Sequence, residues 1–257
     1  MKPLPDTPAP VGLPQEILRP RAGYFRYSAV ELLAALLLLF IVTPFVEILP
    51  YGDLIESVLV TLVMVSAVLA TGGQRWTLAI ALVLVTPALA GKWLNHFAPH
   101  LVPAPVFLVT TAAFFVFIVG RLLRFILHTP RVDTNVLCAG LAGYLMLGLL
   151  WVPAYILTAR LTPGAFAFTT GPQGGSTMEG FNAFYFSLVT LCTVGYGDMT
   201  PVSKVARMLV VMETISGLFY MAVLVSRLVA VYSTQNSSEQ AKASVVDTDS
   251  ESNSKSK

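Results

Sequence analysis

Residues 186–201 read FSLVTLCTVGYGDMTP, and the six letters TVGYGD at its centre occupy Thr193 to Asp198. The apolar stretch Phe181–Leu191 leads into them, and it is about three helical turns long, too short for a bilayer core that needs roughly 20 residues. Irregular backbone at membrane depth is tolerated where it lines a water-filled space. The sequence therefore predicts a re-entrant half-helix followed by a loop that faces water inside the membrane.

Around this loop the chain carries six apolar runs that are candidate membrane spans, five before it and one after it. They are residues 28–49, 54–71, 76–90, 106–127, 136–157 and 205–232. Of the 257 residues, 55% are hydrophobic and 12% are charged, whereas a soluble domain carries about a quarter charged residues. Two cysteines exclude a disulfide scaffold, and a net charge of +2 from scattered bases argues against a nucleic-acid surface. We expect an all-α membrane protein with six transmembrane helices and one re-entrant helix.

The distribution of polar residues divides the chain into four predicted parts. Residues 1–27 and 233–257 hold too few bulky apolar residues to fold alone, so we expect two disordered tails. Between them lie a peripheral region of four helices at 28–131 and a pore domain at 132–232. With a cytoplasmic N-terminus, twelve of the sixteen Lys and Arg residues lie on the inner side of the membrane. The positive-inside rule therefore predicts that both termini are cytoplasmic.

The chemistry of the TVGYGD loop follows from its two glycines. Gly195 and Gly197 can adopt a positive φ at little cost, so successive carbonyl groups can turn toward one axis instead of alternating as in a strand. A ring of backbone carbonyls offers a dehydrated monovalent cation several moderate oxygen ligands without a full charge that would trap it. The loop is therefore a candidate selectivity filter.

In this motif the chain resembles the tetrameric pore-loop potassium channels, and the resemblance covers about Val136–Tyr232. It implies that K+ sites are formed by the carbonyl groups of Thr193, Val194, Gly195 and Tyr196 together with the Thr193 hydroxyl. Tyr196 would pack away from the ions, and Asp198 would stand at the outer mouth. The resemblance implies a passive channel that is not an enzyme, has K+ as its permeant ligand and needs no cofactor.

One chain supplies one such loop, whereas an ion must be surrounded on all sides, so we expect a cyclic homotetramer embedded in lipid. The compact design suits a bacterial inner membrane, that is, a plasma membrane. Two other functions remain open, namely a nonselective cation channel and a nonconducting subunit that modifies other channels. A coupled transporter is disfavoured because the chain shows neither a second filter loop nor a half-to-half repeat.

Two side chains are candidates for supporting the filter. Tyr185 lies eight residues before Thr193 and is a candidate hydrogen-bond donor to Asp198, which is otherwise simply solvated. Glu213 lies in the last span, where an ionisable residue is a functional hypothesis by default. It can pair with a hydroxyl or backbone group of the half-helix and brace the filter from behind, or it can be a merely structural hydrogen-bonded residue.

The last span also contains Gly217 within an otherwise strong helical sequence. By its distance from the filter it matches the hinge glycine of the potassium channel family, and the competing interpretation is close helix packing. Met221 and Val225 lie one and two turns further along the same face, so they are candidates for the cavity lining and an apolar gate.

The sequence of the first four spans does not indicate a voltage sensor. Such a sensor carries Arg or Lys at every third position of its fourth helix, whereas residues 106–120 hold no charge. Arg121 and Arg124 lie at the cytoplasmic end of that span, where positive-inside anchors are expected. We therefore expect the four spans to form a peripheral scaffold.

Overall fold

The computed structural model describes residues 25–46, 49, 51–70, 75–97, 103–129, 133–169 and 177–255. The N-terminal tail expected at 1–27 lies almost entirely outside these residues. In chain order the elements are α1 (Phe25–Val46), α2 (Gly52–Ala70), α3 (Arg75–Phe97), α4 (Ala104–His128), α5 (Thr134–Leu161), β1 (Phe166–Phe168), α6 (Gly180–Leu191), β2 (Met199–Pro201) and α7 (Lys204–Lys255). The described residues include six helices long and apolar enough to cross a membrane, which confirms the all-α membrane fold.

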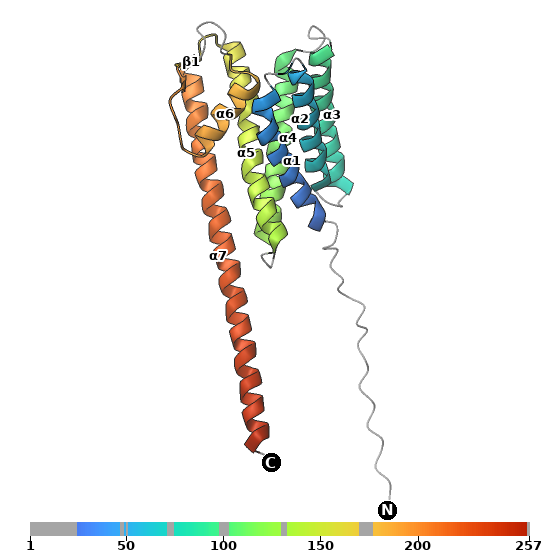
Figure 1. Ribbon diagram of the computed structural model, residues 1–257, viewed down its shortest axis with the longest axis vertical. Helices are drawn as coiled ribbons and strands as arrows, with labels where there is room; N and C mark the ends of the chain where they lie inside the picture. The colour runs from blue at the N-terminus through green and yellow to red at the C-terminus, as the bar shows by residue number, and fades with distance from the viewer. Residues whose placement is uncertain are drawn as a thin grey trace, which may run out of the picture.

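Helices α1 to α4 form a bundle on one side of α5, and α6 and α7 lie on the other side (Figure 1). The bundle contacts α5 through α1 and α4, so α5 is the wall shared by both halves. One continuous apolar core runs through this wall, from Leu36 and Phe114 in the bundle through Met146 to Leu191 and Leu224. The bundle is therefore packed onto the part of the chain that holds the candidate filter.

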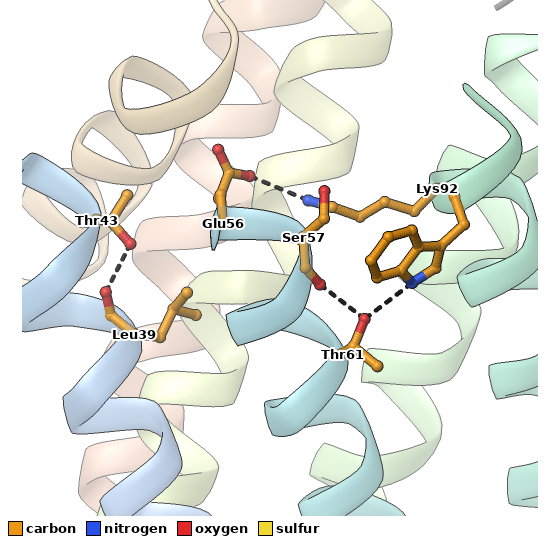
Figure 2. Close-up of polar contacts among 7 residues, drawn as sticks. Leu39, Thr43, Glu56, Ser57, Thr61 and Lys92 are labelled. Carbon is orange, nitrogen blue, oxygen red and sulfur yellow. Dashed lines mark hydrogen bonds and ion pairs between the residues drawn. The ribbon is translucent and has the colours of Figure 1, made fainter. Parts of the chain in front are cut away.

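Polar contacts join the helices of the bundle near the start of α6 (Figure 2). Lys92 Nζ on α3 lies 3.0 Å from Glu56 Oε1 on α2, which pairs two charges at a partly buried position. The indole of Trp93, the next residue on α3, donates to the hydroxyl of Thr61 on α2 over 3.2 Å. A Cβ added at Gly180 would lie 3.8 Å from Glu56 Oε2, so this pair also adjoins the first residue of α6.

A second link joins the bundle to α7 at the opposite end. Arg227 Nη2 on α7 donates to the carbonyl oxygen of Thr129 over 2.9 Å, and Thr129 caps the C-terminus of α4. A cation is favourable there because the last carbonyl groups of a helix carry partial negative charge. This hydrogen bond therefore links α7 to the C-terminus of α4.

Small residues bring α5 and α7 close together. A Cβ at Gly140 would lie 2.8 Å from Leu224 Cδ1, and one at Gly143 would lie 2.2 Å from the Tyr220 hydroxyl oxygen. That hydroxyl donates to the Gly140 carbonyl oxygen over 2.9 Å. Glycine is common at such crossings in membranes because it lets two backbones approach.

Two helices are longer than the sequence indicated. The third span was expected at 76–90, but α3 continues through Pro87 to Phe97. Residues 233–257 were expected to be disordered, whereas α7 continues to Lys255. This tail contains neither Pro nor Gly and includes several good helix formers, so no residue in it stops a helix that already has a nucleus.

Candidate functional site

Helix α6 is the short apolar helix expected at 181–191, and it starts one residue earlier, at Gly180. It packs against both α5 and α7 and buries Ala183, Phe186, Ser187 and Leu191. Cys192 caps the C-terminus of the helix, and its backbone N–H donates to the carbonyl oxygens of Leu188 and Thr190. The predicted filter residues begin directly after this cap.

Residues 193–198 are the predicted filter segment, and their backbone alternates between left-handed and right-handed conformations. Thr193, Gly195 and Gly197 have φ values of 59°, 54° and 80°, whereas Val194 and Tyr196 do not have a positive φ. Alternating left-handed and right-handed residues bring successive carbonyl groups toward one side of the chain, unlike the regular alternation of a strand. Glycine adopts a positive φ without strain, but Thr193 adopts it against the preference of a β-branched residue.

The amide groups of the segment fix the direction of its carbonyl groups. The N–H groups of Val194 and Gly195 both donate to the carbonyl oxygen of Val189 on α6, over 2.9 and 3.3 Å. In a trans peptide the carbonyl points opposite to the N–H of the next residue. The carbonyl groups of Thr193 and Val194 therefore point away from α6, and neither forms a hydrogen bond within the described residues.

The outer end of the segment is held by a short hairpin. Strands β1 and β2 pair antiparallel, with Phe168 opposite Met199. Beyond this pair, the backbone N–H of Thr169 donates to the Asp198 carbonyl oxygen over 2.8 Å, and the Thr169 hydroxyl lies 3.2 Å from the Gly197 carbonyl oxygen. The segment is thus anchored by α6 at its start and by Thr169 at its end.

Tyr185 and Asp198 lie close together at this outer end. Burial, followed by the hydrogen bond and charge of the Asp198 carboxylate, raises the pKa of the Tyr185 hydroxyl above its usual value. Asp198 Oδ1 also accepts from the backbone N–H of Met199 over 3.0 Å. The carboxylate therefore connects the segment to α6 and to β2.

We expect Tyr185→Phe to weaken the outer end of the segment, because it removes the hydroxyl that faces Asp198 and leaves the ring in place. The loss should be about 0.5–1.5 kcal/mol per chain. It is measured as a lower unfolding temperature of the full chain. Tyr51→Phe is the matched control, since Tyr51 is 72% exposed and distant in sequence from the filter. Equal behaviour of the two variants would remove Tyr185 from the site.

Glu213 lies behind the segment, at a position that is completely buried within one chain. Its Oε1 atom lies 2.6 Å from the Ser187 hydroxyl on α6, and its Oε2 atom accepts from the Tyr155 hydroxyl on α5. Ser187 Oγ also lies 2.7 Å from the Gly148 carbonyl oxygen on α5. These contacts join α5, α6 and α7 behind the filter segment.

Gly217 lies one turn further along α7 and contacts the end of α6. A Cβ there would lie 2.8 Å from Leu191 Cδ1 and 3.1 Å from the Leu191 carbonyl oxygen. Helix α7 is continuous through this position. Met221 and Val225 follow on the same face and are exposed in the single chain, whereas Tyr220 and Leu224 are buried.

Several contacts of the site were absent from the sequence analysis. Tyr144 donates to the Leu191 carbonyl oxygen over 3.1 Å, and Tyr155, Ser187 and Thr169 make the contacts described above. Of these residues, Ser187 could have been predicted from the sequence, because its hydroxyl lies on the half-helix that Glu213 was expected to contact. Tyr155 and Thr169 stand in stretches whose composition does not distinguish them.

A half-helix between two long spans is followed by a loop in which the Thr193 and Val194 carbonyl groups have no hydrogen-bond partner within the described residues. This arrangement is typical of an ion channel pore. Comparison with known families agrees, because residues 139–234 match the family described as "Ion channel". These residues run from α5 through the filter segment to α7. The match covers the pore region alone, and it agrees with the prediction of a channel that is not an enzyme.

Several curated relatives are similar to a part of the chain. "Two pore potassium channel c" from Oryza sativa subsp. japonica is 33% identical over 90 residues, which are 35% of this chain and 17% of the relative. "Voltage-gated potassium channel Kch" from Escherichia coli (strain K12) is 50% identical over 48 residues, 16% of this chain and 12% of the relative. "Two-pore potassium channel 2" from Arabidopsis thaliana is 42% identical over 48 residues, 19% of this chain and 11% of the relative.

The chain thus spans less than a fifth of the length of each of these relatives. Each similarity covers at most 35% of this chain. No solved structure matches the chain significantly.

Proposed function

We propose that the protein is a potassium-selective channel whose filter is formed by Thr193 to Asp198. The observation that carries the proposal is the direction of the Thr193 and Val194 carbonyl groups, which point away from α6 and have no hydrogen-bond partner within the described residues. With the carbonyl groups of Gly195 and Tyr196 they would form stacked K+ sites, to which the Thr193 hydroxyl adds one more oxygen. The potassium channels among the relatives support K+ as the permeant ion.

The proposed assembly is a homotetramer around the filter axis. Val194 and Tyr196 are 51% and 72% exposed in the single chain, although they lie at the level of the pore helix. Large apolar side chains that are exposed in one chain need a surface to pack against, and neighbouring chains would supply that surface. Met221 and Val225 on α7 would then line the inner cavity and form an apolar gate, with Gly217 as the hinge or the contact point above them.

Tyr185 and Glu213 would support this filter from outside and from behind. The charge distribution supports cytoplasmic termini. We propose a plasma membrane, the inner membrane of a bacterium, as the location of the protein. Its partners would be lipid, K+ and further copies of the chain, without nucleic acid or a cofactor.

Two alternatives differ in what they conduct. A nonselective channel would share the pore but tolerate Na+, and the pair of positive-φ glycines argues against it because it orders the carbonyl groups. A modulatory subunit would reach the membrane without conducting alone.

The test is ion flux from liposomes that hold the purified chain, with its oligomeric state verified by crosslinking. We expect K+ flux that is much faster than Na+ flux and a crosslinked tetramer. Equal flux of the two ions would favour the nonselective channel. A tetramer that carries neither ion at any membrane potential or pH would contradict conduction and favour the modulatory subunit.

A further inference from the structure

The cluster of Glu213, Ser187 and Tyr155 behind the filter contains three hydrogen-bonded oxygen pairs but only two hydroxyl protons. Three oxygen pairs lie at hydrogen-bond distance, namely Tyr155 with Glu213, Ser187 with Glu213, and Ser187 with the Gly148 carbonyl. Each pair needs one proton between its oxygen atoms. The hydroxyl groups of Tyr155 and Ser187 supply two, and a backbone carbonyl supplies none.

The third proton must therefore belong to the carboxyl group of Glu213. With that proton on Oε1, Glu213 donates to Ser187, Ser187 donates to Gly148, and Tyr155 donates to Oε2. All three pairs are then satisfied. An ionised Glu213 would leave one pair, 2.6 or 2.7 Å apart, as two oxygen acceptors that face each other without a proton.

The surroundings of the carboxyl group agree with a neutral acid. Glu213, Ser187 and Tyr155 are each 0% exposed. Phe166 and Phe186 pack edge-on against the Tyr155 ring, with centroid distances of 5.8 and 5.0 Å, and cover the cluster on that side. Within the residues that the structure describes, no Lys, Arg or His side chain is bonded to Glu213. An isolated buried carboxylate is strongly disfavoured, so such a group keeps its proton or finds a cation.

We infer that Glu213 is a neutral carboxylic acid that donates to Ser187 and thereby positions the pore helix α6 between α5 and α7. The inference rests on the proposed function for its effect on ion flux, but the protonation state stands on the hydrogen-bond count alone. Glu213 is a positioning residue, because it acts on the filter through Ser187 and α6 and touches no ion. Its proton is a structural donor that holds α6 in place.

The proton can be observed directly by infrared difference spectroscopy of the full chain in lipid at neutral pH. We expect the wild type to show the carbonyl band of a protonated carboxylic acid, and Glu213→Gln to lack it. Glu179→Gln is the matched control, because Glu179 is exposed and pairs with Arg160 over 2.8 Å, and it should leave the band unchanged. An unchanged band in Glu213→Gln would mean that Glu213 is ionised, and the inference would be overturned.

The positioning role is tested by rescue. A glutamine at 213 offers an N–H donor and a carbonyl acceptor where the neutral acid offers O–H and C=O, with one further N–H, so Glu213→Gln should keep most of the flux and of the tetramer. Glu213→Ala leaves Ser187 and Tyr155 without that partner and should lower K+ flux by about tenfold or more. Equal loss in both variants, or loss in neither, would overturn the positioning role.

These measurements separate the inference from the proposed function. Absence of K+ flux in the wild type would count against the channel, whereas the infrared band would still report the proton on Glu213. In that case the positioning role is tested by thermal unfolding. The unfolding temperature of Glu213→Gln should remain close to that of the wild type, and that of Glu213→Ala should be lower.

Discussion

Replacing Gly195 by alanine should abolish selective K+ flux while the chain remains folded. Gly195 has a φ of 54°, and a Cβ added there has no neighbour within 4 Å, so the effect is backbone strain and not a clash. The strain costs about 1–2 kcal/mol per chain, or about 4–8 kcal/mol over four copies. A change of φ relieves it but turns a carbonyl group away from the axis. We expect K+ flux to fall by at least about a hundredfold.

The control for this variant is Gly164→Ala in the turn before β1. Gly164 has a φ of 77° and also lacks neighbours within 4 Å of an added Cβ, so alanine meets similar strain outside the filter. It should lower stability by about 1–2 kcal/mol and leave most of the K+ flux. Selective K+ flux at the wild-type rate through Gly195→Ala would show that these carbonyl groups do not bind the permeant ion.

Gly217→Ala should lower both the stability of the chain and its K+ flux. The new methyl group would lie 2.8 Å from Leu191 Cδ1 and 3.1 Å from the Leu191 carbonyl oxygen, so it pushes on the end of α6. Leu191 stands two residues before the filter, and its displacement moves Thr193. Overpacking of this kind costs about 1–3 kcal/mol per chain. Thermal unfolding and liposome flux measure the two effects.

This variant also separates packing from a hinge. As a hinge alone, position 217 would gain helix stability from alanine, by up to about 1 kcal/mol, and only the opening of the pore would change. Gly120→Ala on α4 is the matched control, because an added Cβ there has nothing within 4 Å. A Gly217→Ala chain as stable as Gly120→Ala would refute the packing effect. A lower unfolding temperature in Gly217→Ala alone would support it.

The parts of the fold that depend on local sequence could be predicted. The length of an apolar run determines whether a helix can span a membrane, so the spans and the short α6 were readable from composition. The positive φ of Gly195 and Gly197 was readable because glycine is the residue that adopts it without strain. The positive φ of Thr193 could not be predicted, because a threonine side chain does not favour that conformation.

The contacts between distant helices could not be predicted in the same way. Tyr155 is 58 residues from Glu213, and the two meet because α5 and α7 cross with those faces together. Thr169 holds Asp198 from a segment of ordinary composition. The helical pattern of a membrane span shows which residues share a face, but a span that is apolar all round does not reveal which face meets which helix.

The cluster of Glu213, Tyr155 and Ser187 is already completely buried within a single chain. Its formation therefore does not wait for a neighbour. In the proposed assembly a newly made subunit finishes the scaffold behind its filter first, and the exposed Val194 and Tyr196 find their surroundings later. Formation of the channel then consists of two steps, the folding of each subunit and the association of subunits in the bilayer. Only the association depends on how many copies the cell makes.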